Sequence, residues 1–221
     1  MRLIITGCEY AGKTTLANEI SGWRTRTMGP AIPPGMPEFH DHFTLPEISH
    51  DDTTDEDAAQ VWALSPKVKG LIQNHQVGYH MNPAFYADHD NILVGFHIED
   101  AVYAPKYYGY GGNGERSHWA RIVEAEIIGK AFDTVLLLLT ASPETIRERM
   151  RANPHSRGLV KDEDVEEVLQ SFEHEFSRSI LRYRFSLDTS NATVQETLDQ
   201  FVEQMVPMLR DSDRLRMQTM A

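Results

Sequence analysis

Cysteine is nearly absent from this chain of 221 residues, and long hydrophobic runs are absent too. The single cysteine, Cys8, excludes an internal disulfide and favours a reducing compartment. The longest apolar run, "VLLLL" at 135–139, is far too short to cross a bilayer, and the first residues are typical of a strand rather than of a signal peptide. We therefore expect a soluble cytoplasmic protein without a membrane partner.

Basic residues are also scarce. The chain has 21 Lys and Arg against 33 Asp and Glu, which gives a formal net charge of −12. A field of this sign repels nucleic-acid backbones, so a nucleic-acid partner is disfavoured. Because the only arginine-rich segment is 147–157, the composition favours a small phosphorylated ligand over a polymer.

The strongest signal present is G-x-x-x-x-G-K-T at residues 7–14, with an apolar strand before it and a helix after it. Its two glycines allow backbone conformations in which successive N–H groups point at an anion. Lys13 is expected to reach the β- and γ-phosphates, and the Thr14 hydroxyl to ligate Mg²⁺. A chance turn would lack this strand–loop–helix context. The expected ATP-binding residues of the loop are Gly7, Cys8, Glu9, Tyr10, Ala11, Gly12, Lys13, Thr14 and Thr15.

Two further absences narrow the class of phosphate-loop protein. The guanine-reading N-K-x-D and the switch sequence D-x-x-G are missing, which argues against a GTPase switch. Neither "TVLLLLT" nor "NILVGF" ends directly in an acidic residue, as the corresponding strand of a motor or AAA-type ATPase would. A kinase needs an acceptor pocket and mobile arginines over the transferred phosphate, and the chain offers candidates for both.

Apolar strands alternate with helical segments along the chain, which predicts a parallel sheet covered on both faces. We expect an α/β three-layer sandwich of the phosphate-loop NTPase type, with a five-stranded parallel sheet and a helical lid. The ligand should lie at the carboxyl ends of the strands. Residues 1–210 are expected to form a single kinase domain with its lid at about 147–162, and residues 211–221 a polar C-terminal tail.

The chain resembles the thymidylate kinase and deoxynucleoside kinase branch of the nucleoside and nucleotide kinases. The resemblance runs from the loop through "FHIEDAVYAPKYY" to "IRERMRANPH" and "LDTS". It implies that Arg147 and Arg151, which lie one helical turn apart, are at the start of the lid segment. One such side chain packs by the adenine of ATP, and others clamp phosphates. Arg149 and Arg157 are further clamp candidates. The alternative is a solvated helix face whose arginines pair with Glu144 and Glu148.

One departure from that family concerns the end of the third strand. Members commonly carry Asp-Arg there, to help place the metal and the acceptor, and this chain has Val94-Gly95. Glu99 or Asp100 could replace the missing acid as a Mg²⁺ partner. The alternative is that both are only charges favoured at a helix start.

Fewer sequence signals indicate which residues contact the phosphoryl acceptor. Asp41 occupies the place where deoxynucleoside kinases carry their acidic base, although "HDH" could simply be a polar strand end. His97, Tyr103 and Tyr107 are further candidates for contact with the acceptor, and core packing is the alternative for the tyrosines.

Together these patterns predict an enzyme that uses ATP and Mg²⁺ to phosphorylate a nucleoside, a nucleotide or a related small molecule. Two alternatives stay open: an ATP-binding or regulatory ATPase without transfer activity, and a kinase of a modified base within DNA. The sequence does not exclude a homodimer.

Overall fold

Runs of apolar residues become the strands of one parallel sheet in the computed structural model, which describes residues 1–31, 39–41, 54–85, 90–155 and 158–220. β1 (Arg2–Gly7), β3 (Asn91–Gly95), β4 (Val135–Thr140) and β5 (Tyr183–Asp188) form the body of the sheet, and the three-residue β2 (Phe39–Asp41) lies beyond β3. The order is β2-β3-β1-β4-β5, and each neighbouring pair is parallel.

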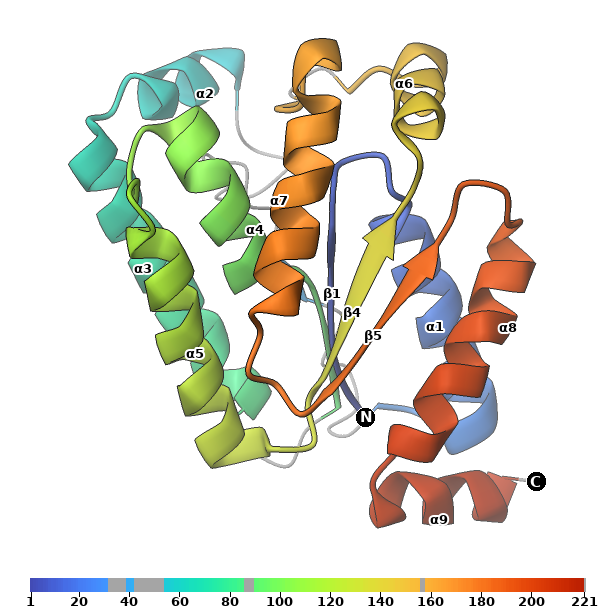
Figure 1. Ribbon diagram of the computed structural model, residues 1–221. Coiled ribbons are helices and arrows are strands. Elements are labelled where there is room, and N and C mark those ends of the chain that lie inside the picture. The colour runs from blue at the N-terminus through green and yellow to red at the C-terminus, as the bar shows by residue number, and fades with distance from the viewer. Residues whose placement is uncertain (32–38, 42–53, 86–89, 156–157, 221) are drawn as a thin grey trace.

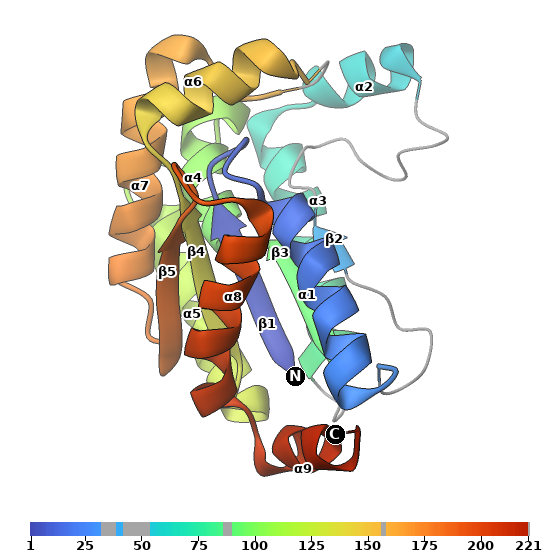
Figure 2. The same ribbon diagram turned by 90° about the vertical axis from the view of Figure 1, so that its right-hand side faces the viewer.

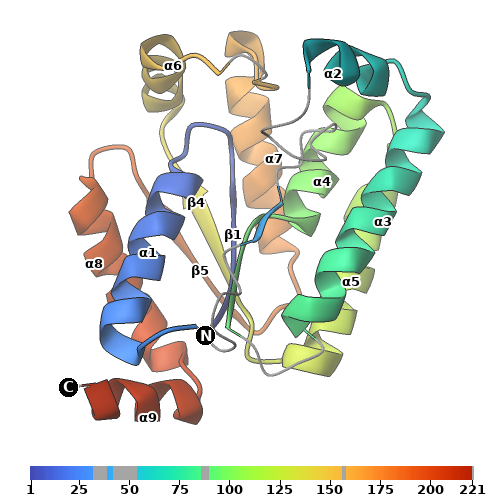
Figure 3. The ribbon, with the colours of Figure 1, turned by 180° about the vertical axis from the view of Figure 1, so that it is seen from behind.

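Helices cover both faces of this sheet, so its central strands are buried. The helices are α1 (Lys13–Met28), α2 (Asp55–Trp62), α3 (Pro66–Phe85), α4 (His97–Tyr103), α5 (Glu115–Ala131), α6 (Pro143–Ala152), α7 (Val165–Ser177), α8 (Val194–Met205) and α9 (Asp211–Met220), with the short turns η1 (Ala104–Tyr108), η2 (Asp162–Asp164) and η3 (Val206–Met208). α1 and α8 lie on one face, and α4, α5 and α7 on the other, with α3 beside α5 (Figures 1 and 3). This arrangement confirms the predicted α/β layers.

The two ends of the sheet differ in what covers them. Figure 2 shows α6 and α2 at the end where the loop after β1 turns into α1, and α9 across the opposite end. Because all strands are parallel, the first of these ends is the carboxyl end, where ligands of such sheets bind. No helix within the described ranges is long and apolar enough to cross a membrane.

Local signals in the sequence explain several helix starts. Ser142 caps α6 by accepting a hydrogen bond from the N–H of Thr145, and Pro143 occupies the first helical position. Thr193 and Glu196 form a reciprocal capping box at the start of α8. α3 begins at Pro66, and proline is favoured at the first position of a helix.

An acidic stretch begins α2. Asp55, Glu56 and Asp57 form its first turn, and Thr54 and Asp57 cap each other there.

The expected polar tail is instead largely the helix α9, which packs against α1. Its polar residues are not all solvated, since Asp213 is 1% exposed.

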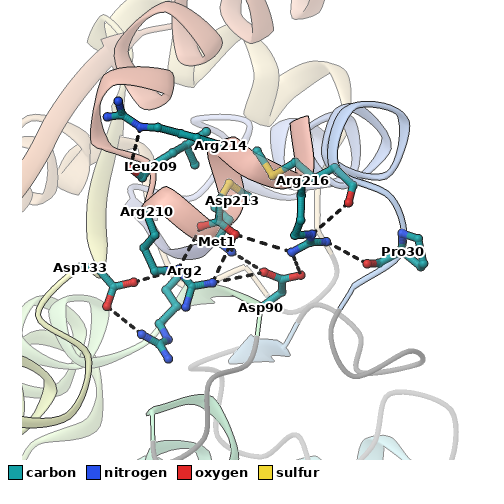
Figure 4. Close-up of polar contacts among 11 residues, drawn as sticks. Met1, Arg2, Pro30, Asp90, Asp133, Leu209, Arg210, Asp213, Arg214 and Arg216 are labelled. Atoms are coloured by element: carbon teal, nitrogen blue, oxygen red, sulfur yellow. Dashed lines mark hydrogen bonds and ion pairs between the residues drawn. The ribbon is translucent and has the colours of Figure 1, made fainter. Parts of the chain in front are cut away.

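An ion network holds α9 across the amino end of the sheet (Figure 4). The ammonium group of Met1 pairs with Asp90 and, at 3.0 Å, with Asp213. Arg210 binds the other oxygen of Asp213 at 3.0 Å, and Arg216 binds Asp90 at 2.8 Å. Five buried or half-buried groups from three distant parts of the chain therefore neutralise one another.

We expect Asp213→Asn to lower the free energy of unfolding by about 3 kcal/mol, the usual scale for removing one partner of a buried ion pair. Although burial opposes it, hydrogen bonds from Arg210 and attraction to the Met1 ammonium hold the pKa of Asp213 below its ordinary value. A lowered folded-state pKa contributes stability that is complete above the unfolded-state pKa, near 4, and is lost as the pH falls through the folded-state value.

Urea unfolding measured from neutral pH into the acid range should therefore show a steeper decline for the wild type than for Asp213→Asn. Asp211→Asn, an exposed change in the same helical turn, is the matched control and should stay close to the wild type. Equal stability of Asp213→Asn and Asp211→Asn at neutral pH would refute the role of the network.

Candidate active site

The loop between β1 and α1 owes its shape to glycine at two positions. Gly7 has φ = 147°, and a Cβ there would lie 2.2 Å from the carbonyl oxygen of Leu139 in β4. Gly12 has φ = 95° in the left-handed region and caps the start of α1. The chain can therefore pass close to β4 and enter α1 with free N–H groups directed out of the helix end.

Lys13 is the first residue of α1, and its ammonium group lies against the loop. Nζ donates hydrogen bonds to the carbonyl oxygens of Gly7 (2.6 Å) and Cys8 (3.2 Å) and forms an ion pair with Glu99 Oε1 at 2.9 Å. Burial raises the pKa of Glu99, and the charge of Lys13 opposes that rise. Burial also raises the pKa of the Cys8 thiol to about 12, so this thiol is protonated and unreactive at neutral pH.

A strained turn delivers Glu99 to this position. β3 ends at Gly95 (φ = 96°), and the next residue, the buried Phe96, has φ = 70°, which a bulky side chain rarely adopts. Such a conformation costs on the order of 1–3 kcal/mol, and packing around Phe96 must hold it. α4 starts directly afterwards and carries Glu99 in its first turn.

Asp100, the second predicted metal partner, is engaged elsewhere. Its carboxylate is fully buried and binds Arg116 of α5, and it accepts a hydrogen bond from Tyr110 at 3.1 Å. Burial raises the pKa of Asp100 to about 6, although the charge of Arg116 opposes the rise. His97 likewise turns to α5, where its Nε2 lies 3.1 Å from Glu124 Oε1. Of the two carboxylates, Glu99 is the one that lies beside Lys13.

The two tyrosines predicted at the acceptor support the loop and the lid. The N–H of Glu9 donates a hydrogen bond to the hydroxyl of Tyr103 at 3.0 Å, and Tyr103 is buried against Phe172. The hydroxyl of Tyr107 donates to Asp164 at 3.0 Å. A contact of either side chain with an acceptor stays a prediction.

Side chains of the loop also hold the segment that follows α6. The carboxylate of Glu9 accepts hydrogen bonds from the N–H groups of Leu159 (2.9 Å) and Val160 (3.0 Å). The Tyr10 hydroxyl accepts one from the N–H of His155 at 3.0 Å, and the two rings stack with their centroids 4.3 Å apart. The predicted lid region is thus held directly against the loop between β1 and α1.

The three arginines of α6 divide between its two faces. Arg147 forms a bidentate pair with Glu166 of α7 at 2.6 and 2.8 Å and contacts Asp162, whereas Glu144 and Glu148 were the partners expected for a solvated face. Arg151 is exposed and makes no hydrogen bond or ion pair within the described residues. Nothing in these contacts places Arg147 or Arg151 on a phosphate, so their clamp role stays a prediction.

Arg149, which the sequence suggested only as a further clamp, is the arginine that contacts the loop. It donates to the carbonyl oxygen of Tyr10 at 2.9 Å and to both the hydroxyl and the carbonyl oxygen of Thr189, just after β5. The Thr189 hydroxyl in turn donates to the Ala11 carbonyl at 3.0 Å. The segment "LDTS" was the only sequence signal for this buttress. Arg157 lies outside the described residues.

Asp41 ends β2 beside Gly95, its partner in the register of β2 and β3. Its backbone is therefore at the carboxyl end of the sheet, on the same edge as the loop. Its side chain lies outside the described part of the structure, so the proposed base is placed by topology alone.

A divalent cation fits this site through Glu99. The described residues contain no cluster of three or more His, Cys, Asp or Glu side chains that could bind a metal by themselves. Glu99 is a buried carboxylate with Lys13 as its counter-charge, and Mg²⁺ in nucleotide sites often binds one or two carboxylates with phosphates and waters. Glu99 and Thr14 are the residues that would hold it, and the cation would neutralise phosphate charge.

Comparison with known proteins gives the same fold at low sequence identity. No protein-family model and no curated protein sequence matches the chain. The structure of the Bacillus subtilis YorR protein in complex with phosphorylated GDP is 18% identical, with a TM-score of 0.56 over 95% of this chain and 99% of that one. Deoxyadenosine kinase from M. mycoides with bound dATP is 14% identical, with a TM-score of 0.58 over 93% of this chain and 100% of that one.

Thymidylate kinase from Candida albicans is also 14% identical, with a TM-score of 0.59 over 93% of this chain and 90% of that one. The chain therefore has the fold of the phosphate-loop nucleoside and nucleotide kinases.

The contacts of Arg149 predict an effect on stability that Arg151 should not have. Arg149→Ala leaves two carbonyl oxygens and one hydroxyl without a donor, so we expect the free energy of unfolding to fall by about 1–3 kcal/mol. Arg151→Ala, two residues away on the exposed face, is the matched control and should change it by less than about 0.5 kcal/mol. Urea unfolding of the nucleotide-free variants measures both changes in free energy. Equal changes in the two variants would contradict the proposed support of the loop by Arg149.

Proposed function

We propose that the protein is a kinase that transfers the γ-phosphoryl group of ATP, with Mg²⁺, to a nucleoside, a nucleotide or a related small molecule. The observation that carries the proposal is the loop at residues 7–15, at the carboxyl end of β1, with the Lys13 ammonium group against it. Positioning and neutralisation of charge supply most of the catalysis in phosphoryl transfer, and such a loop supplies both. Neighbours of the same fold include kinases named for deoxyadenosine and thymidylate.

A buried amide on α3 is a candidate contact for an acceptor that carries a nucleobase. The side chain of Gln73 is fully buried, and neither its oxygen nor its nitrogen has a hydrogen-bond partner among the described residues. An unpaired buried amide costs about 1–3 kcal/mol, so a partner is expected in the working state. The edge of a purine or pyrimidine offers the adjacent donor and acceptor that an amide can bind.

The second candidate function is nucleotide binding without transfer. Gly95 stands where similar kinases carry the arginine of their Asp-Arg pair, and its φ of 96° favours glycine there. The arginine of that pair therefore has no equivalent at this position. A kinase built on this chain has to position its acceptor with other groups, and Asp41 and Gln73 are the candidates.

The reaction is tested by following labelled phosphate from ATP in a panel of nucleosides and nucleoside monophosphates. We expect transfer to at least one member in the presence of Mg²⁺, and Lys13→Ala should abolish it because the charge that meets the phosphates is lost. Melting curves of both proteins distinguish loss of function from loss of fold, and Mg·ATP should raise the melting temperature of the wild type more than GTP does. Full transfer by a folded Lys13→Ala protein would rule out this site.

Asp41→Asn tests the acceptor base separately. The substitution keeps size and removes the basic oxygen, so transfer to a hydroxyl acceptor should fall by roughly 10²–10⁴-fold. ATP affinity should stay nearly constant because the loop is untouched, and isothermal titration measures it. A milder loss would indicate that the acceptor is already a phosphate. An unchanged rate would indicate that another carboxylate acts as the base.

A further inference from the structure

Among the described residues, Glu99 is the one anionic partner of Lys13, and Lys13 is the one cationic partner of Glu99. Lys13 has three N–H bonds, and its three neighbours are two loop carbonyls and Glu99. Glu99 has Lys13 as its sole polar partner among the described residues, and the two side chains are only 12% and 7% exposed. Neither charge can turn to another group without leaving its partner uncompensated.

A nucleotide bound at the loop would break this balance. Its phosphates need the charge of Lys13, and they would bring several negative charges next to the Glu99 carboxylate. Glu9 adds a second carboxylate of the loop, already used by the N–H groups of Leu159 and Val160. A buried carboxylate that loses its cation is strongly destabilising, so metal-free nucleotide must bind against this cost.

Three described arginines, which belong to α6 and α5, already have partners of their own. Arg149 is occupied by the carbonyl oxygens of Tyr10 and Thr189, and Arg147 by Glu166. Arg116 binds Asp100 on the side of α4 that faces α5. A cation that arrives with the ligand can supply the replacement charge without breaking any of these contacts.

We propose that Glu99 couples nucleotide binding to a divalent cation: phosphate takes Lys13 from Glu99, and the cation takes its place on the carboxylate. The inference rests on the proposed nucleotide site and does not depend on phosphoryl transfer. It assigns Glu99 a positioning role with two partners, Lys13 in the free protein and a cation such as Mg²⁺ in the complex. The metal would then be required for affinity as well as for turnover.

Calorimetric titration of the full chain with ATP, in EDTA and in excess Mg²⁺, tests the coupling without any acceptor. For the wild type we expect Mg²⁺ to tighten ATP binding on the order of 100-fold. For Glu99→Gln, which keeps the shape and removes the charge, metal-free ATP should bind more tightly than to the wild type. The gain from Mg²⁺ should then fall below about 10-fold.

Glu126→Gln is the matched control, because Glu126 pairs with Lys130 on the exposed face of α5, away from the loop. It should reproduce the wild-type values. If Glu99→Gln does not fold, which a melting curve shows, the wild type still gives a reciprocal measurement. Binding of Mn²⁺, followed by its electron paramagnetic resonance signal, should tighten in the presence of ATP by the same factor by which Mn²⁺ tightens ATP.

The outcomes separate this inference from the proposed function. Equal ATP affinity of the wild type with and without Mg²⁺, or an unchanged Mg²⁺ gain in folded Glu99→Gln, overturns the coupling and leaves the kinase proposal standing. Absence of ATP binding under both conditions overturns both. A large gain in the wild type that Glu99→Gln loses and Glu126→Gln retains supports the coupling.

Discussion

The largely buried ammonium group of Lys13 contacts each of the three elements from which the candidate site is built. It binds the carbonyl oxygens of Gly7 and Cys8 at the end of β1, it begins α1, and it draws Glu99 of α4 to the same point. A single cation thus brings together the end of β1, the start of α1 and the first turn of α4, which lie between residues 7 and 99 of the chain.

The two ends of the sheet differ in how their buried charges are neutralised. At the amino end, the ions of Met1, Asp90, Asp213 and Arg216 neutralise one another, and this end holds α9 in place. At the carboxyl end, Lys13 is the single cationic partner of Glu99 among the described residues. The charges at the amino end are therefore shared by several ions, whereas Glu99 depends on one cation.

Side chains that neighbour each other in sequence took different roles because helices rotate them apart. Glu99 and Asp100 are consecutive, yet one lies beside Lys13 and the other binds Arg116 of α5. Arg149 contacts the loop while Arg147 contacts α7, although both belong to one arginine-rich run. In each case the sequence indicated a run of residues that contains the contacting side chain. It could not select the member, because the rotation of α4 and α6 is set by packing against distant elements.

What the sequence by itself determined is the glycine-shaped loop at residues 7–14 and the parallel α/β arrangement. The loop depends on glycine conformations and a helix start within eight consecutive residues, and the sheet depends on alternating apolar segments, so both are local properties. Tertiary structure alone decided that residues 211–220 pack as a helix, that Thr189 and Arg149 support the loop, and that Glu99 is the partner of Lys13. These contacts join residues far apart in the chain, and their formation depends on burial and charge balance that exist only after the layers have packed.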